Sequence, residues 1–330
     1  MKEEDVRKYL SMSDEEHRNN IRRAAENLKG IIRPTALIRS DYYSREFGCD
    51  IYIKPENLQV TGSFKIRGAY NKISNLTKEE AANGIIASSA GNHAQGVAFS
   101  AQKKGIKSTI VMPNVTPLLK VNATKAYGSD VVIYGDVYDD AYAKAMELAS
   151  EKGYTFVHPF DDYDVLCGQG TIGLEILEAL EDVDEILVPI GGGGLISGIA
   201  LAVKTVRPDI KVIGVSPVGS MAMKISLEER HVTRLSSVKT SAEGVAVRQP
   251  GDLTFALAGK YVDEIITITE KDIMEAVLVV LEKHKLIAET AGVVPLAGVK
   301  KRAKPGRKIV CLMSGGNIDV NILARIIDRG

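Results

Sequence analysis

The sequence has little cysteine. Its 330 residues include three, at positions 49, 167 and 311, and these are odd in number, far apart and not arranged as C-x-x-C. This pattern argues against a disulfide framework and against a zinc site. We therefore expect reduced, mostly buried thiols and a cytoplasmic protein.

An excess of charge is also missing. The 42 basic and 42 acidic residues give a formal net charge of zero, whereas partners such as nucleic acids or membrane surfaces select a basic excess. No apolar run approaches the roughly 20 residues that span a bilayer, and the first residues, MKEEDVRKYL, are too charged for a signal peptide. We expect no nucleic-acid partner and no membrane association.

Short β-branched segments alternate with amphipathic helical ones along the chain. Such alternation predicts an α/β protein with mostly parallel strands and helices on both faces. Glycines at 105, 128 and 153 match helix C-terminal caps. The expected strands are residues 84–88, 107–112, 130–135, 184–190, 211–215 and 308–313. Residues 54–157 hold three or four βα units and are expected to form a subdomain.

The segment VPIGGGGLISG (188–198) places four glycines between a predicted strand and a helix that starts near Leu195. A plain turn does not need four glycines, whose ordering carries a large entropic cost. Backbone N–H groups there can bind an anion, helped by the helix dipole. A small phosphate-bearing ligand therefore fits Gly191, Gly192, Gly193, Gly194 and Leu195. The spacing matches neither a dinucleotide fingerprint nor a P-loop.

A G-x-G-x-x-G match does occur at GQGTIG (168–173). The preceding HPFDDYDVLC is acidic and irregular, whereas the dinucleotide motif follows a strand. We interpret the match as a helix start packed tightly on a neighbouring element.

Two more junctions place small polar residues after predicted strands. ASSAGNHAQG (87–96) starts a helix near Asn92 or His93, and LMSGGNID (312–319) follows the last strand. Serines at such places often only cap helices, but small residues at a helix N-terminus also bind carboxylates. The two junctions predict a carboxylate site and a polar strand end.

Lys65 lies in TGSFKIRGAY (61–70), framed by small residues. Most lysines are solvated, but a desolvated amine is a nucleophile toward carbonyls. Pyridoxal phosphate needs a Schiff-base lysine, a phosphate site, a partner for its ring nitrogen and a site for the amino-acid carboxylate. Together, the lysine and the three loops supply this set.

The sequence resembles the fold-type II pyridoxal-phosphate enzymes, and within them the threonine and serine dehydratases and serine racemase. It is most similar to short, catabolic-type threonine dehydratases. The resemblance runs from about residue 20 to the C-terminus and rests on PENLQVTGSFKIRGA (55–69), SSAGNHAQG (88–96), GQGTIGLEI (168–176), PIGGGGLISG (189–198) and SGGNID (314–319). It implies two open, twisted, mostly parallel sheets flanked by helices. Residues 1–53 plus 158–330 would form a large cofactor-binding domain, and 54–157 a small domain closing over the active site.

The resemblance also implies site roles. Lys65, beside Phe64, would hold the cofactor as a Schiff base and act as general base. Asn92 would bond the ring hydroxyl, the loop 191–195 the phosphate, and Ser314 the ring nitrogen. The substrate carboxylate would lie against Ser89, Ala90, Gly91, Asn92 and His93, with Glu289 near the substrate amine.

The implied reaction is loss of water from L-threonine or L-serine, giving a 2-oxo acid and ammonia. A neutral Ser314 hydroxyl does not enforce a protonated ring nitrogen, which favours prompt elimination. Racemases of this group carry a serine where this chain has Ala90, so racemisation is not expected as the main activity.

The resemblance bears on regulation as well. The loop SPVGSMAMK (216–224) has no acidic side chain, so the divalent-cation site of the racemases is not expected. The chain ends soon after SGGNID, which predicts no isoleucine feedback. Some short relatives respond to nucleotides, and a nucleotide effector is left open. A homodimer or homotetramer is expected.

Three alternatives stay open at this point. Two are a serine racemase and a hydroxyaspartate dehydratase of the same family. The third is a non-catalytic regulator that binds an amino acid or a phosphate on the same scaffold.

Overall fold

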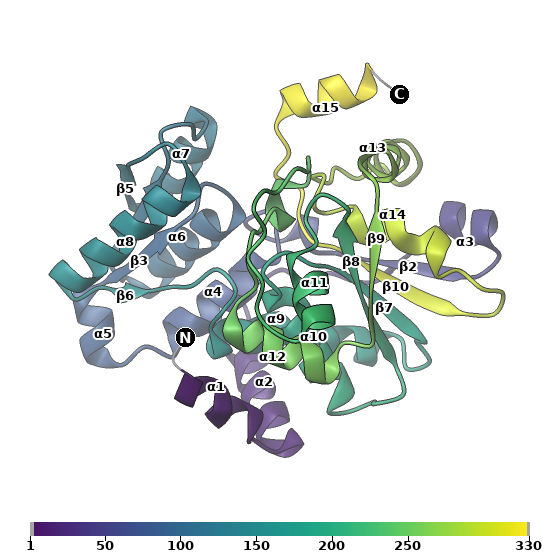
Figure 1. The fold of residues 1–330 in the computed structure, drawn as a ribbon, viewed down its shortest axis with the longest axis horizontal. Coiled ribbons are helices and arrows are strands. Elements are labelled where there is room, and N and C mark those ends of the chain that lie inside the picture. The colour runs from purple at the N-terminus through teal and green to yellow at the C-terminus, as the bar shows by residue number, and fades with distance from the viewer. Residues whose placement is uncertain (1–2, 329–330) are drawn as a thin grey trace.

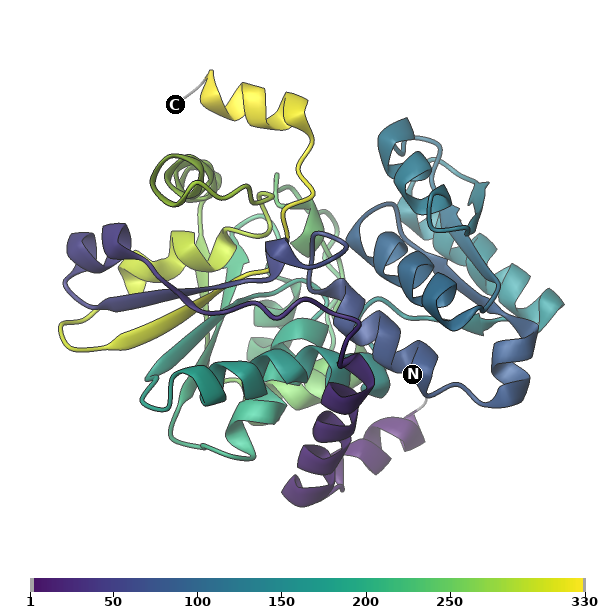
Figure 2. The same cartoon turned by 180° about the vertical axis from the view of Figure 1, so that it is seen from behind.

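The computed structural model describes residues 3–328 and contains two sheets side by side, each covered by helices (Figures 1 and 2). The larger sheet has six strands in the order β1-β2-β10-β7-β8-β9, and the smaller has four in the order β5-β4-β3-β6. All neighbouring strands are parallel except β1 and β2. The strands are β1 Ile38–Arg39, β2 Asp50–Pro55, β3 Ile85–Ser88, β4 Ser108–Met112, β5 Asp130–Ile133, β6 Thr155–Phe156, β7 Glu185–Pro189, β8 Lys211–Pro217, β9 Glu264–Ile268 and β10 Lys308–Met313.

The helices connect the strands and cover both faces of each sheet. The α-helices are α1 Glu3–Leu10, α2 Asp14–Leu28, α3 Asp41–Phe47, α4 Lys65–Ser74, α5 Lys78–Asn83, α6 Asn92–Lys104, α7 Leu118–Lys125, α8 Tyr138–Lys152, α9 Tyr163–Ala179, α10 Gly194–Lys204, α11 Ala222–Glu229, α12 Asp252–Tyr261, α13 Glu270–Val279, α14 Val294–Gly298 and α15 Val320–Ile327. Short 3-10 turns are η1 Glu56–Leu58, η2 Glu243–Val245 and η4 Val299–Lys301, and Val280–His284 is a π-helical turn.

The larger sheet separates two hydrophobic cores. Alternate residues of a strand point to opposite faces. In β10, for example, Val310 and Leu312 face the core formed with α2, α9, α10 and α12. Ile309, Cys311 and Met313 face the core formed with α3, α13 and α14. Because both faces are buried, central strands such as β7 and β10 are nearly continuous apolar runs.

The smaller sheet is built in the same way. Helices α4, α6 and α7 pack on one face and α8 on the other. Its strands all lie within 54–157, and the strands of the larger sheet lie outside that range except for the last two residues of β2. This placement supports the predicted division into 1–53 plus 158–330 and 54–157, which remains a proposal.

The six strands predicted from the sequence are all present, within two residues at each end. Helices α6 and α8 end at Gly105 and Gly153 in the left-handed conformation, as predicted. Gly128 also has a positive φ, of 84°, but lies three residues beyond the end of α7. Cys49, Cys167 and Cys311 are buried free thiols. Within residues 3–328, no helix has both the length and the apolar character needed to cross a membrane.

Candidate active site

Lys65 lies where the two sheets meet, as the first residue of α4. The loop before it runs antiparallel to the SGGN loop after β10. Ser63 and Gly315 form an isolated β-bridge, and the Phe64 N–H donates to the Ser314 carbonyl at 3.1 Å. Thus two motifs about 250 residues apart in the sequence are direct neighbours.

The Lys65 amine has no acidic hydrogen-bond partner among the described residues. Its Nζ donates to the Pro159 carbonyl at 2.7 Å and lies 5.3 Å from the centre of the Phe64 ring. Burial lowers the pKa of Lys65 to about 8, although the charge of Glu289 opposes this shift. A larger share of the amine is therefore uncharged at neutral pH than for a solvated lysine, as a nucleophile requires.

The tetraglycine loop follows β7 and leads into α10. Gly193 has a φ of 96° and is the N-cap of α10, which starts at Gly194, one residue before the predicted position. Within residues 3–328, the N–H groups from Gly191 to Leu195 have no protein acceptor. Unpaired N–H groups in a buried loop at a helix N-terminus form a site for an anion.

The glycines also allow Phe160 to pack closely on the loop. A methyl group added at Gly192 would lie 2.5 Å from the Phe160 ring, and one at Gly194 would lie 2.8 Å from the Phe160 backbone. Phe160 follows Pro159, the residue that accepts the hydrogen bond from Lys65. One short segment therefore contacts both the lysine and the tetraglycine loop.

The predicted carboxylate site lies at the start of α6. The helix begins at Asn92, and its N-cap residue is Gly91. Ser89, Ala90, Gly91 and Asn92 are partly exposed, whereas His93 is buried. The Nε2 of His93 pairs with the Val157 carbonyl at 2.9 Å, and burial together with the charge of Lys65 lowers the pKa of His93 to about 3. His93 is therefore a neutral, fixed side chain and not an acid at neutral pH.

Asn92 connects the small-sheet helix to the loops of the larger sheet. Its Nδ2 donates to Glu289 Oε1 at 2.7 Å, and its Oδ1 accepts from Asn317 Nδ2 at 2.8 Å. Glu289 is close to Gly315, where an added methyl group would lie 2.6 Å from its Oε1. Burial raises the pKa of Glu289 to about 7, although the hydrogen bond from Asn92 opposes this. Ser314 is buried beside these residues, with its Oγ 3.5 Å from the Ala291 carbonyl.

Several buried polar atoms of the site have no hydrogen-bond partner in the described protein. They are Thr61 Oγ1, Ser63 Oγ, Ser88 Oγ and His93 Nδ1. Thr61 and Ser63 belong to the loop before Lys65, Ser88 is the last residue of β3, and His93 is in the first turn of α6. Buried polar groups are normally paired, so these atoms, the free N–H groups of the tetraglycine loop and the desolvated amine fit a polar ligand that bears an aldehyde and a phosphate.

A long connection between α11 and α12 covers the site, and the sequence reasoning missed it. An added methyl group at Gly244 in this connection would lie 3.5 Å from Glu289 Oε1. Lys120 of α7 pairs with Glu243 at 3.1 Å, and Arg234 pairs with Asp139 of α8 at 2.6 Å. The sequence signal was the length of the segment, because long irregular loops in compact proteins are often functional.

The family of the chain follows from comparison with known proteins. Residues 28–315 match the family model described as "Pyridoxal-phosphate dependent enzyme". The chain belongs to this family. Its fold is the predicted fold-type II architecture, and pyridoxal phosphate is the family's cofactor.

Relatives share most of the chain. An L-threonine ammonia-lyase of Thermotoga maritima is 49% identical over 94% of this chain and 78% of its own length. A catabolic L-threonine dehydratase, TdcB, of Escherichia coli K12 is 43% identical over 93% of this chain and 95% of its own length. The processed threonine deaminase isoform 2 of Solanum lycopersicum has a TM-score of 0.93 and 39% identity, covering 96% and 89% of the two chains.

The GQGTIG motif differs in part from its predicted role. It lies in the middle of α9 and not at a helix start, which corrects that detail. The close packing is confirmed, because methyl groups added at Gly168 and Gly170 would lie 2.5 Å from the Arg67 carbonyl and 2.8 Å from the Gly198 carbonyl. The glycines of this motif allow the helices to pack closely together.

Among residues 3–328, no cluster of three or more His, Cys, Asp or Glu side chains is arranged to bind a metal ion.

Proposed function

We propose that the chain is a threonine dehydratase that converts L-threonine to 2-oxobutanoate and ammonia, and L-serine to pyruvate and ammonia. The observation that supports this most is a desolvated Lys65 amine bonded to the Pro159 carbonyl. The next residue, Phe160, packs on the tetraglycine loop with its free N–H groups, and the charge of Lys65 acts on His93 in the first turn of α6. The named activities of the relatives point the same way.

The residues present fit pyridoxal phosphate. The N–H groups from Gly191 to Leu195 would hold its phosphate, Asn92 its ring hydroxyl and Ser314 its ring nitrogen, with Lys65 bound to its aldehyde and Phe64 beside it. When bound, the cofactor withdraws electrons from the substrate Cα and so acidifies the Cα proton.

Side chains and backbone groups of the protein would bind the substrate and move its protons. The N-terminal turn of α6 and residues 89–93 would bind the substrate carboxylate, since a helix N-terminus favours a negative charge. Glu289 would attract the substrate ammonium from the opposite side. The released Lys65 amine, with its pKa near 8, would take the Cα proton. Water is lost at Cβ, and hydrolysis returns one water when ammonia leaves.

The absence of a hydroxyl at position 90 favours elimination over racemisation. A racemase needs a second acid on the other face of the substrate to return a proton, and Ala90 cannot supply it.

We also propose a cytoplasmic homodimer or homotetramer. The three buried free thiols favour a reducing compartment.

The test is a 2-oxo acid assay with L-threonine, L-serine, their D-forms and 3-hydroxyaspartate, on the wild type and Lys65→Ala. We expect turnover of L-threonine and L-serine that the variant lacks. Retained turnover in Lys65→Ala would overturn the assignment. A colourless wild type that takes up no pyridoxal phosphate would favour a non-catalytic regulator instead. Dominant formation of D-serine would favour a racemase, and a preference for 3-hydroxyaspartate would favour a hydroxyaspartate dehydratase.

A further inference from the structure

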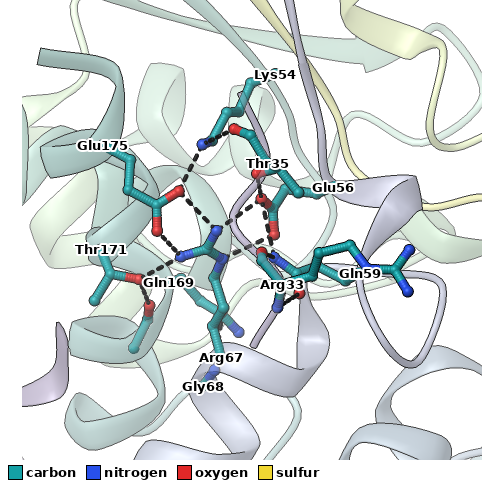
Figure 3. A network of polar contacts seen from close by, with 11 residues as sticks. Arg33, Thr35, Lys54, Glu56, Gln59, Arg67, Gly68, Gln169, Thr171 and Glu175 are labelled. Atoms are coloured by element: carbon teal, nitrogen blue, oxygen red, sulfur yellow. Dashed lines mark hydrogen bonds and ion pairs between the residues drawn. The ribbon is translucent and has the colours of Figure 1, made fainter. Parts of the chain in front are cut away.

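Arg67, two residues after Lys65, is fully buried and uses all the hydrogen-bond donors of its side chain (Figure 3). Nε and Nη2 donate to the two oxygens of Glu56, each at 2.8 Å. Nη1 and Nη2 donate to the two oxygens of Glu175 at 2.5 and 2.9 Å, and Nη1 also donates to Thr171 Oγ1 at 3.0 Å. A guanidinium has five N–H donors in a rigid plane, so these five acceptor atoms, from three residues, fix its position and its orientation.

The surrounding network balances the charge of Arg67. Lys54 donates to Glu175 Oε2 and to the Thr35 carbonyl, each at 2.5 Å, and Thr35 Oγ1 donates to Glu56 at 2.6 Å. Two cations therefore face two carboxylates. Although burial alone would raise the pKa of Glu56, the charge of Arg67 and its hydrogen bonds keep that pKa below the usual value. Glu56 can thus stay ionised beside the fixed guanidinium.

The network attaches the first turn of α4 to α9. Glu175 and Thr171 belong to α9, and Gln169 of the same helix accepts a hydrogen bond from the Gly68 N–H at 3.2 Å. The helices touch closely, since a methyl group added at Gly68 would lie 2.4 Å from Gln169 Nε2. Through Gly170, α9 in turn contacts α10 at Gly198. A continuous contact therefore runs from α4 to the helix that starts in the tetraglycine loop.

The start of α4 lacks the usual means of being fixed. Its N-cap residue is Phe64, which provides no side-chain cap. The Ser63–Gly315 bridge holds the chain before Lys65, and Arg67 holds it after. We infer that Arg67 is a positioning residue: its bonds to Glu56, Glu175 and Thr171 fix the first turn of α4, and so set where the Lys65 amine lies relative to the tetraglycine loop. This inference rests on the proposed role of Lys65.

The conservative variant Arg67→Lys distinguishes the effect of the positive charge from the effect of the orientation of the guanidinium. Lysine keeps the positive charge but has three donors on a flexible stem and cannot bond two carboxylates in one plane. The matched control is Arg302→Lys. Arg302 makes an equivalent two-bond pair with Glu185 at 2.8 and 2.8 Å, at the end of the larger sheet where β7, β9 and β10 begin.

The experiment measures kcat, KM, melting temperature and the fraction of Lys65 bound to cofactor in each holoenzyme. Borohydride adds hydride to the C=N carbon, a proton from water goes to nitrogen, and the resulting secondary amine marks Lys65 in a peptide digest. For Arg67→Lys we expect kcat to fall about 10- to 100-fold, as misplacement near 1 Å can cause. We also expect KM to stay within about threefold and a clearly smaller labelled fraction. Arg302→Lys should lower only the melting temperature.

Wild-type kcat and labelling in Arg67→Lys would overturn the inference. An equal loss of kcat in Arg302→Lys at the same melting temperature would also overturn it, because stability alone would then explain the loss. If Arg67→Lys does not fold, Thr171→Val and Glu175→Gln replace it, and wild-type labelling and kcat in both would overturn the inference. A wild type that is labelled at Lys65 but inactive on L-threonine refutes the proposed reaction, while the labelling comparison still tests Arg67.

Discussion

Asn92 and Glu289 share a hydrogen bond of 2.7 Å although 197 positions separate them in the sequence. The bond joins the start of α6, beside the smaller sheet, to a loop of the larger sheet. Because burial raises the pKa of Glu289 to about 7, this carboxyl changes charge in the neutral range. Its state should therefore govern how the substrate ammonium binds.

The first prediction concerns pH and Glu289. As pH falls through about 7, Glu289 gains a proton and loses its attraction for the ammonium, so KM of the wild type should rise. Glu289→Gln should show a KM about tenfold higher at pH 8, since a hydrogen bond to a charged group contributes about 1.5–3 kcal/mol. Its KM should also show no change near pH 7. Steady-state kinetics from pH 6 to 9 check this, and a persistent change in the variant would assign the titration to another group.

The second prediction concerns the stability of the cofactor-free protein. The pKa of Lys65 is lowered to about 8 in the folded state, against 10.5 for a free lysine side chain, so the unfolded chain binds more protons between these values. The contribution of Lys65 to the free energy of unfolding should therefore rise from pH 8 to 10.5. Lys65→Met should be the more stable protein at pH 7, by on the order of 1–3 kcal/mol, and lose that advantage by pH 10.5. Urea unfolding of both proteins at several pH values measures the difference, and a constant difference would contradict the lowered pKa.

The third prediction uses the contact of Phe160 with the tetraglycine loop. An added methyl group at Gly192 meets the Phe160 ring, whereas one at Gly194 meets the Phe160 backbone. Both Gly192→Ala and Gly194→Ala should weaken pyridoxal phosphate binding by about 10-fold or more, because overpacking costs roughly 1–3 kcal/mol. A second change, Phe160→Leu, should restore binding only to Gly192→Ala. Equilibrium titration measures this, and equal rescue of both variants would show that the ring is not the obstacle.

The fourth prediction concerns Ala90 at the start of α6. Ala90→Ser adds a hydroxyl where racemases of the family carry one, and it should raise the rate of D-serine formation from L-serine about tenfold or more, in the range that a positioned acid or base contributes. Ala90→Gly is the control, because it alters the backbone without adding an acid. Chiral chromatography alongside the 2-oxo acid assay gives the ratio of the two products. No gain in D-serine over the control would mean that another group limits racemisation.

The main strands and the loops of the site could be predicted from the sequence, because each is a local pattern. Buried parallel strands such as β7 and β10 are apolar runs, and four consecutive glycines are easily recognised as a functional loop. Strand β2 is not predicted from the sequence, because DIYIKP is short and mixes polar with apolar residues. Strand β9 is not predicted either, and most of its residues are only partly buried.

Contacts between residues far apart in the sequence could not be predicted. Nothing local relates Arg67 to Glu175, or Asn92 to Glu289, because these contacts depend on how helices dock. The GQGTIG motif shows the same limit. Its glycines could be recognised as packing residues, but its place in the middle of α9 could not be read from an irregular flanking sequence.

The position of β10 also bears on how the protein is made. β10 lies between β2 and β7, and the loop after it supplies Ser314 and the partner of Ser63. Until Lys308–Met313 has been synthesised, β2 and β7 have no strand between them and Lys65 lacks one wall of its surroundings. The surroundings of Lys65 are therefore complete only after β10 and the loop that follows it have been synthesised. A nascent chain that stops before β10 would leave two strand edges unpaired, which makes late truncation an aggregation hazard.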